Sequence, residues 1–469
     1  MIAPLRYRLS LFIALALWLT AFGPAEAGRS VFPDLKKVTL GNELKVNLLP
    51  DNRHPLASFA LTINAGSGAD TRDKSGLATL TGMMLRQGSR NYPDEALLKV
   101  FDSLGGTLEM AVYRDYAIIT GDVLARDIEL ALTILADMII RPNFTPETLS
   151  RLKRQLVSEI MHLDSSPEYV GDNVLYTSFY PESGYGLPLH GTMAGIRKIN
   201  LDDINDYYRM YFQPGNASLT VTGDFDPASL KKHVVNDFSA WPKGPVVKVT
   251  PPVPVMSDSL KILLVDNPSA PSCYFAIGRP AVPISDDRFS SLNLVNYIIG
   301  GGNELSRLNR RLVREQSLAI NVNSRIDMSH ADGMLIVSGR AANELAADAL
   351  VEALKVMQDM GQMKVPSDEL NEARRFYRNI FYQLFETSID KAVGLGHVMA
   401  LGEEAEYYDK LIEMSDRVDS DYLRQLAAEF FSPAGVRLVV VGPELELRSR
   451  LLEIAPVAVS YTHLTLPTN

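Results

Sequence analysis

An internal repeat is the sequence feature that most constrains the fold. Residues 211–230 (YFQPGNASLTVTGDFDPASL) match residues 430–449 (FFSPAGVRLVVVGPELELRS) at an offset of 219 residues. In both copies an aromatic residue and the pattern Phe-x-Pro precede an apolar run that ends in Gly. A second pair, 144–160 and 364–380, has prolines that lie 220 residues apart. Two matches at nearly one offset indicate a duplicated domain, so we expect two halves with the same fold.

The segment between the two copies is a candidate linker. Residues 241–257 include five prolines, which disfavour both helix and central strand. We therefore predict an N-terminal domain over 36–240, a linker over 241–257 and a C-terminal domain over 258–456. The chain of 469 residues is long enough for two such domains, and its 46% hydrophobic and 22% charged residues are typical of a soluble globular protein.

Strand and helix patterns alternate within the first half. Residues 44–50, 57–65 and 117–124 are short apolar or alternating runs, which are typical of β-strands. Residues 145–163 carry leucines and isoleucine at helical spacing, behind Thr145 as a favourable N-cap and a proline at the first helical position. The pattern predicts the α+β class, with an antiparallel sheet packed by helices in each half.

The two ends of the chain differ from its body. Two arginines precede an apolar run at 11–22, and the small residues AEA follow it at 25–27. The run is shorter than the roughly 20 residues that a membrane-spanning helix needs. We predict a signal peptide over 1–27, and hence an exported protein of the bacterial periplasm with no membrane anchor after signal cleavage. The last ten residues, 460–469, match nothing in the first half and look like translated sequencing adapter, so we expect a non-native tail.

Composition narrows the possible partners. Cys273 is the only cysteine, so no disulfide can form within the chain. The formal net charge of −10 and the lack of a Lys/Arg cluster argue against nucleic acid as a partner. Acidity alone identifies no substrate.

The segment GLATLTGMMLRQGS at 76–89 predicts an amphipathic helix. Leu77, Leu80 and Met84 recur at the spacing of a buried helix face. Positions 79 and 83 lie one turn apart, which is the spacing at which two histidines bind one zinc ion, with a glutamate at position 82 as the base. In this chain the three positions hold Thr79, Gly82 and Met83.

A family resemblance covers roughly residues 36–456. The run INAGSGADTRDKSGLATLTGMMLRQGS at 63–89, with FDSLGGTLEM at 101–110 and SEI at 158–160, resembles the N-terminal half of the pitrilysin or insulinase family of zinc peptidases. That family includes mitochondrial processing peptidase and short bacterial two-subunit peptidases. Residues 296–324 resemble the corresponding part of the family's C-terminal domain. The resemblance implies two homologous α+β domains of the metallopeptidase LuxS/mitochondrial processing peptidase-like type.

The resemblance also locates the metal motif. Active members carry H-x-x-E-H and a third ligand, a glutamate, about 75 residues downstream. On this chain the motif falls on Thr79, Gly82 and Met83, and the downstream glutamate falls on Glu159. A threonine hydroxyl is a poor zinc ligand, a thioether suits Cu(I) better, and glycine has no side chain to move a proton. We therefore predict a catalytically degenerate member without a catalytic residue, in which Glu159 is the only retained ligand-equivalent.

No histidine pair offers a replacement metal site. The seven histidines are His54, His162, His190, His233, His330, His397 and His463, and no two lie within a helical turn of each other. We expect each to be a surface residue or a polar residue with satisfied hydrogen bonds, although a site assembled from distant residues stays open. The prediction is a chain without a cofactor, with zinc only in a partner subunit.

The resemblance further suggests peptide binding by an edge strand. Residues 107–120 form one long candidate strand that includes Tyr113, Arg114 and Tyr116. An open strand edge accepts an extended peptide through backbone hydrogen bonds. The alternative is a strand that is internal or already paired, and the sequence leaves both open.

A second family feature is an Arg and a Tyr, seven residues apart in the C-terminal half, that hold the substrate. Alignment without gaps places Val313 and Ile320 at these positions. Arg314 is one residue along and is the remaining candidate for part of the Arg role. This departure weakens the case that the chain completes a partner's active site through that pair.

These observations favour an exported pseudo-peptidase subunit that helps to bind and enclose peptides for an active H-x-x-E-H homologue in a hetero-oligomer. A solitary peptide-binding or scaffold protein with the same fold is the alternative. An active zinc-dependent endopeptidase is the weakest hypothesis, because Gly82 cannot act as a base.

Overall fold

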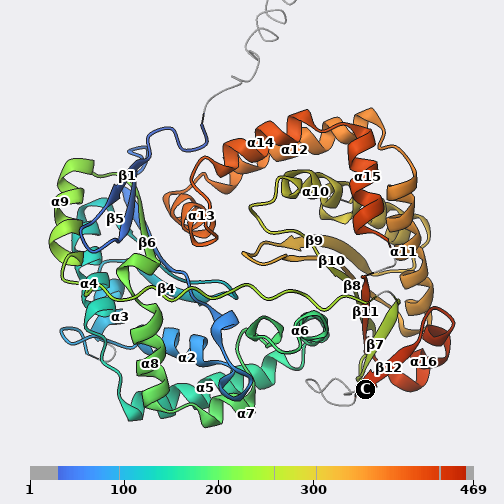
Figure 1. The fold of residues 1–469 in the computed structure, drawn as a ribbon, viewed down its shortest axis with the longest axis horizontal. Helices are drawn as coiled ribbons and strands as arrows, with labels where there is room; N and C mark the ends of the chain where they lie inside the picture. The colour runs from blue at the N-terminus through green and yellow to red at the C-terminus, as the bar shows by residue number, and fades with distance from the viewer. Residues whose placement is uncertain (1–29, 94–95, 258, 303, 433–434, 461–469) are drawn as a thin grey trace, which may run out of the picture.

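The computed structural model describes residues 30–93, 96–257, 259–302, 304–432 and 435–460. The predicted signal peptide lies outside these residues, as does the predicted tail except for Ser460. Two six-stranded sheets dominate the fold, one in each half (Figure 1). The first sheet has the order β1 (Lys36–Thr39), β2 (Lys45–Pro50), β6 (Ala217–Gly223), β3 (Leu56–Ile63), β5 (Ala117–Leu124) and β4 (Thr107–Val112). The second has the order β12 (Val457–Ser460), β7 (Lys261–Asp266), β11 (Arg437–Gly442), β8 (Cys273–Pro280), β10 (Met334–Ala341) and β9 (Asn321–Asp327).

Five strands of each sheet repeat one topology. The order β2-β6-β3-β5-β4 of the first sheet corresponds to β7-β11-β8-β10-β9 of the second. In both sheets the first pair of this series is parallel and the other neighbours are antiparallel. The predicted α+β class with two homologous halves is confirmed. The sheets are mixed and not antiparallel throughout as predicted, because β6 and β11 each return beside the first strand of the series in parallel after a helical crossover.

The sixth strand of each sheet breaks the repeat. β1 precedes β2 and pairs with it antiparallel, whereas β12 comes from the end of the described chain and pairs with β7 in parallel. The second sheet therefore includes residues 457–460, beyond the predicted domain end at 456.

Helices cover the outer faces of both sheets (Figure 1). Those of the first half are α2 (Leu77–Leu85), α3 (Ala96–Ser103), α4 (Ile128–Ile140), α5 (Pro146–Leu163), α6 (Pro167–Phe179), α7 (Met193–Lys198), α8 (Leu201–Tyr211) and α9 (Pro227–Phe238). Those of the second half are α10 (Arg288–Asn296), α11 (Ala346–Gln362), α12 (Ser367–Leu384), α13 (Ser388–Ala400), α14 (Tyr407–Arg417), α15 (Ser420–Phe430) and α16 (Glu444–Leu452), with π-helical turns at Tyr297–Gly301 and Asn309–Glu315. The repeat predicted from 144–160 and 364–380 corresponds to α5 and α12. As predicted, the Thr145 hydroxyl caps α5 by accepting from the N–H of Thr148.

The two halves exchange one helix. α6 follows α5 in the first half but packs on β8 and β11 of the second sheet, where the Tyr274 hydroxyl donates to Asp172 at 2.8 Å. α13 follows α12 in the second half but packs on β3 and β6 of the first sheet, where the Asn47 amide donates to the sulfur of Met399 at 2.8 Å. Figure 1 shows α13 beside β6, at the end of the helical layer that α12 and α14 form. The Tyr408 hydroxyl of α14 donates to the carbonyl of Gly394 in α13 at 3.0 Å, so α13 contacts both halves. The halves therefore form one interlocked unit.

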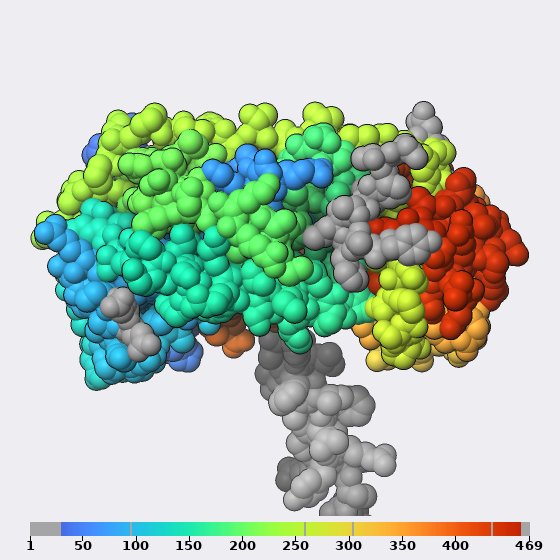
Figure 2. All heavy atoms as spheres, turned by 90° about the horizontal axis from the view of Figure 1, so that it is seen from below, coloured from blue at the N-terminus to red at the C-terminus, as the bar shows by residue number. Residues whose placement is uncertain are grey.

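The predicted linker passes along the outside of both halves. Residues 242–257 contain no helix or strand, and the N–H of Val255 donates to the carbonyl of Phe179 at 2.8 Å. From below, the teal and green helices of the first half form a continuous surface (Figure 2). Among the described residues, no helix is both long and apolar enough to cross a bilayer.

Candidate functional site

Buried contacts at its N-terminus hold α2 in place. Gly76 precedes the helix with a φ of 99°, a left-handed conformation that favours glycine. The buried carboxylate of Asp70 accepts from the N–H groups of Gly76 at 2.7 Å and Ala78 at 2.9 Å. Burial raises the pKa of Asp70 to about 7, against the opposing effect of these backbone hydrogen bonds. The helix buries Leu80 and Met84 against α5 and turns its opposite face outward.

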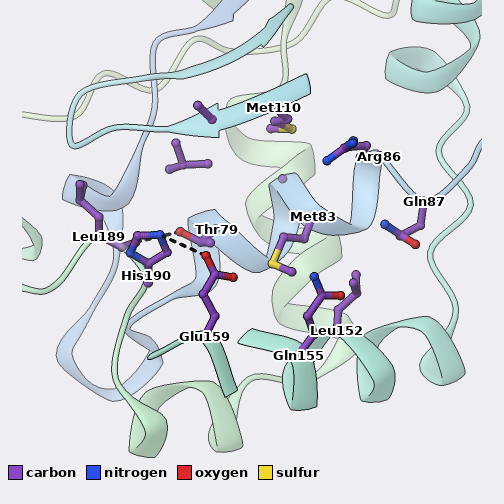
Figure 3. Close-up of a pocket in the computed structure, with 13 residues that line it drawn as sticks. Thr79, Met83, Arg86, Gln87, Met110, Leu152, Gln155, Glu159, Leu189 and His190 are labelled. Atoms are coloured by element: carbon purple, nitrogen blue, oxygen red, sulfur yellow. Dashed lines mark hydrogen bonds and ion pairs between the residues drawn. The ribbon is translucent and has the colours of Figure 1, made fainter. Parts of the chain in front are cut away.

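That outward face lines a pocket of about 370 Å³ between α2, α5 and β4 (Figure 3). The lining residues are Thr79, Gly82, Met83, Arg86 and Gln87 from α2 and its C-terminal end, Met110, Ala111 and Val112 from β4, Leu152, Gln155 and Glu159 from α5, and Leu189 and His190 from the loop before α7. The pocket therefore brings together all four positions that the family motif predicted.

Thr79 has a structural role in the pocket. Its hydroxyl donates to the carbonyl of Leu189 at 2.8 Å. This bond ties α2 to the loop that carries His190. The oxygen offered at the first ligand position is thus a hydroxyl that is already engaged in a protein hydrogen bond.

Gly82 lets β4 approach α2 closely. A Cβ atom at this position would lie 2.8 Å from the Met110 methyl carbon and 3.3 Å from a methyl group of Val112. The side chain of Met110 therefore occupies the space into which a larger side chain at position 82 would project. A glycine in a helix interior costs about 1 kcal/mol relative to alanine, so the helix alone does not favour Gly82. The close contact with Met110 accounts for its presence.

Glu159 faces His190 across the pocket. Its Oε1 lies 3.7 Å from His190 Nε2, and the side chains are 46% and 33% exposed (Figure 3). Burial lowers the pKa of His190, and the charge of Glu159 opposes this effect. His190 Nδ1 is buried without a hydrogen-bond partner.

His190 is a pocket residue that the sequence analysis missed. It lies neither on α2 nor on α5, so no helical spacing connects it with the motif positions. The loop before α7 brings it in, where its carbonyl packs 3.0 Å from the position of a Cβ on Gly76. The position of His190 is therefore a consequence of tertiary structure.

The donors in the pocket do not fit zinc. Protein zinc sites use at least three nitrogen, oxygen or thiolate ligands. Here Glu159 and His190 supply two, and the third candidate is the soft thioether of Met83. Within the described parts of the chain, no group of three or more His, Cys, Asp and Glu side chains is arranged to hold a metal ion.

β4 presents a strand edge beside the pocket. Among the described strands it pairs with β5 alone. Met110 and Val112 point toward α2, where their side chains lie within 4 Å of the position of a Cβ on Gly82. The predicted single strand over 107–120 is wrong, because the chain reverses at 113–116 and continues as β5.

The turn residues of this hairpin lie outside the pocket lining. Arg114 stacks 3.4 Å from the centre of the Tyr176 ring, and its Nε donates to the carbonyl of Tyr185 at 2.9 Å. Tyr116 is buried and its hydroxyl bonds to His397 of α13. Tyr113 is 42% exposed and stacks on Tyr116 with ring centres 4.8 Å apart. Arg114 and Tyr116 thus hold the turn against α6 and α13, and Tyr113 alone of the three has a largely accessible ring.

The candidates from the second half also lie outside the pocket lining. Arg314 is exposed, Val313 packs against the core of the second half, and Ile320 is 62% exposed. The cation of the pocket is Arg86, which the sequence analysis did not select. Arg86 lies on the same helix face as the motif, because the spacing of positions 79, 82, 83 and 86 is helical. That spacing could have identified it as a pocket residue.

Comparisons with known proteins agree with this architecture. Residues 45–193 match the family model for insulinase, peptidase family M16, and residues 198–377 match the model for the peptidase M16 inactive domain. A Bacillus subtilis protein named uncharacterized zinc protease YmxG is 22% identical over 85% of this chain and 96% of its own length. The Helicobacter pylori protein named non-peptidase homolog YmxG is 23% identical over 71% of this chain and 77% of its own length. The mitochondrial-processing peptidase subunit beta of Dictyostelium discoideum is 20% identical over 88% and 90%.

Solved structures show the same fold. A peptidase M16 inactive domain from Pseudomonas fluorescens aligns with a TM-score of 0.81 at 20% identity, covering 87% of this chain and 98% of that one. A chain of complex III2 from Candida albicans aligns with a TM-score of 0.75 at 15% identity, covering 89% of this chain and 99% of that one. The first model lies within the first half, and the second runs from the end of α7 through the linker into α12 of the second half. Helix α2 carries Thr79, Gly82 and Met83 where the sequence analysis predicted the H-x-x-E-H motif. The chain belongs to the insulinase family, peptidase family M16.

Proposed function

We propose that the protein is a non-catalytic subunit of an exported insulinase-type zinc peptidase, in which it helps to bind and enclose peptides for an active partner. One observation carries this proposal. The pocket and its adjoining strand edge are present, while Thr79, Gly82 and Met83 supply neither a zinc ligand set nor a group for proton transfer.

The strand edge supports peptide binding. β4 has unpaired backbone groups on the side away from β5, and an extended peptide can pair with such an edge with little demand on its sequence. The pocket lies beneath that edge and offers space for a side chain of the peptide. Tyr113 and Arg314, the two exposed candidates from the sequence, would contact a peptide or the partner rather than the pocket.

Similarity to subunits supports a partner. Dictyostelium mitochondrial-processing peptidase subunit beta is by its name one subunit of a larger enzyme, and the Candida albicans chain is part of complex III2. M16 family members thus occur in hetero-oligomers. In the proposed assembly the partner carries the intact H-x-x-E-H motif and the zinc, and this chain carries no cofactor.

Export rests on the sequence. The predicted signal peptide over 1–27 favours the periplasm, where the chain would meet an exported partner and peptides.

The test is affinity purification of the tagged full chain from the extracytoplasmic fraction of its native cells, with mass spectrometry of the co-purifying proteins. We expect a stoichiometric homologue with an intact H-x-x-E-H motif. Recovery of the chain alone would overturn the partnership and favour a solitary binding or scaffold protein. Chelator-sensitive hydrolysis by the isolated chain would overturn the non-catalytic role.

A further inference from the structure

The pocket has opposite charges at its two ends. Figure 3 shows Arg86 at one end and the Glu159–His190 pair at the other, with Met83 between them. Met83, Arg86 and Glu159 come from α2, its C-terminal end and α5, and these two helices share one buried cluster. The loop that carries His190 is tied to α2 by the bond from Thr79 to the carbonyl of Leu189. A bound side chain would therefore meet a different charge at each end.

Arg86 lacks a protein partner at its end of the pocket. Its Nε atom is buried without a hydrogen-bond partner, and no carboxylate among the described residues forms an ion pair with it. Arg151, which is nearby, does have a protein partner: its guanidinium donates to the side-chain oxygen of Gln87 at 2.6 Å. A buried donor without a partner is costly, and a guanidinium group is well suited to bind a carboxylate with two parallel hydrogen bonds.

Glu159, at the other end of the pocket, needs no ligand to compensate its charge. It already faces His190 at 3.7 Å, and 46% of its side chain is exposed to solvent, which compensates its charge. The group in the pocket that lacks a partner is therefore the Arg86 guanidinium, and an anion would supply one.

The strand edge determines how a peptide side chain would reach Arg86. Alternate side chains of a strand point to the same face of a sheet, and Met110 and Val112 of β4 point toward the pocket. A peptide that pairs with the free edge of β4 places every second side chain on that face. The apolar walls formed by Met83, Met110 and Leu152 suit an aliphatic stem, and the Arg86 guanidinium group offers donors at its end.

We propose that Arg86 is the specificity-determining residue of this pocket and selects extended peptides that place an acidic side chain in it. This inference rests on the proposed peptide-binding function. It adds the substrate class: peptides that bind as a strand along β4 and carry a glutamate or aspartate on the face toward α2.

Fluorescence anisotropy with the full mature chain tests the inference. Three labelled ten-residue peptides of β-branched and apolar residues differ only at one central position, which is Glu, Gln or Lys. Because strand pairing can slide in register, that position can reach the pocket. We expect the Glu peptide to bind about tenfold more tightly than the Gln peptide, and the Lys peptide to bind most weakly.

Two variants of Arg86 and one control locate the effect. Arg86→Gln should bring the Glu and Gln peptides to within about twofold of each other, and Arg86→Glu should make the Lys peptide the tightest of the three. Arg90→Gln is the matched control, because Arg90 is an exposed arginine just past α2 that does not line the pocket. Circular dichroism and the melting temperature confirm that each variant is folded.

The outcomes separate the two proposals. Binding of all three peptides with no preference for Glu, or a preference that survives in Arg86→Gln, would overturn the selectivity while leaving peptide binding intact. Absence of binding for all three peptides would overturn peptide binding itself, and the inference with it.

Discussion

The carboxylate of Asp51, at the end of β2, forms an ion pair with the ammonium group of Lys391 on the exchanged helix α13. The two side chains are only 13% and 12% exposed. The pair therefore joins the first sheet to a helix from the second half across a nearly buried contact. Arg53 also bonds to Asp51 at 2.7 Å from the solvent side.

Lys391→Ala should lower the free energy of unfolding by about 2 kcal/mol, because it leaves a poorly hydrated carboxylate with Arg53 as its only cation. Urea denaturation followed by circular dichroism measures the change. Lys410→Ala is the control, since Lys410 pairs with Asp287 on the surface with side chains 57% and 77% exposed. That control should change the free energy of unfolding by less than about 0.5 kcal/mol. Equal effects of the two variants would show that the nearly buried pair stabilises the fold no more than a surface pair does.

Asp51 should also make stability depend on pH in the acid range. The hydrogen bonds from Arg53 hold its pKa below the ordinary value, against burial, which raises it, and Lys391 adds to the lowering. A carboxyl with a lowered folded pKa stabilises the protein above its unfolded pKa near 4, and this stabilisation is lost as the pH falls through the folded pKa. The stability difference between wild type and Asp51→Asn should therefore be constant from pH 5 to 8 and shrink below pH 4. A difference that grew toward low pH would contradict this sign.

The exchanged helices should keep the two halves together after the linker is cut. A protease site inserted after Lys243, in the exposed linker, allows cleavage of the folded protein. We expect the two fragments to elute as one particle in gel filtration and to separate only in denaturant. Fragments that separate in native buffer would show that α6 and α13 do not hold the halves.

Gly82→Ile should destabilise the protein, because a branched side chain would need the space that Met110 and Val112 occupy. The new Cβ alone would lie 2.8 Å from the Met110 methyl carbon and 3.3 Å from a methyl group of Val112. Overpacking of this kind costs about 1–3 kcal/mol, which thermal unfolding detects as a lower Tm. Met110→Ala in the same chain should recover most of the loss specific to position 82. Gly41→Ile is the control, since a Cβ there meets no atom within 4 Å.

Zinc binding should return when both histidines are restored. Thr79→His together with Met83→His places two imidazoles one helical turn apart in the pocket that Glu159 lines. We expect about one zinc per chain by elemental analysis after dialysis, against a trace for wild type. Thr79→His alone is the control and should bind zinc weakly. If the double variant remained without zinc, the assignment of the motif to positions 79, 83 and 159 would be wrong.

The duplicated fold was predictable because it rests on local signals. The repeat around Pro214 and the helix behind Thr145 each carry their own pattern of turn, cap and apolar spacing, and the structure has both. The exchange of α6 and α13 was not predictable, because amphipathic patterns show that a helix buries one face but not which sheet covers it. The hairpin at 113–116 was missed for a related reason, since its turn is stabilised by contacts of Arg114 and Tyr116 with distant helices.

The pocket was predictable only in part. Thr79, Gly82, Met83 and Glu159 converge as the family motif implied, because α2 and α5 pack along faces that the sequence spacing already defined. His190 came from a loop without periodicity, and the reason for Gly82 lies on a strand 28 residues away, at Met110. Both depend on contacts that form only in the folded chain.

The inner face of the first sheet is small and polar where α13 covers it, with Thr62, Ser218, Thr220 and Thr222 among its side chains. During synthesis this sheet is complete at Gly223, yet its cover begins only at Ser388, some 165 residues later. At roughly 5–20 residues per second, the ribosome needs roughly 8 to 33 s to make that stretch. A sheet face rich in hydroxyl groups can stay hydrated during this time, whereas an apolar face would promote aggregation until the helix that covers it has been synthesised.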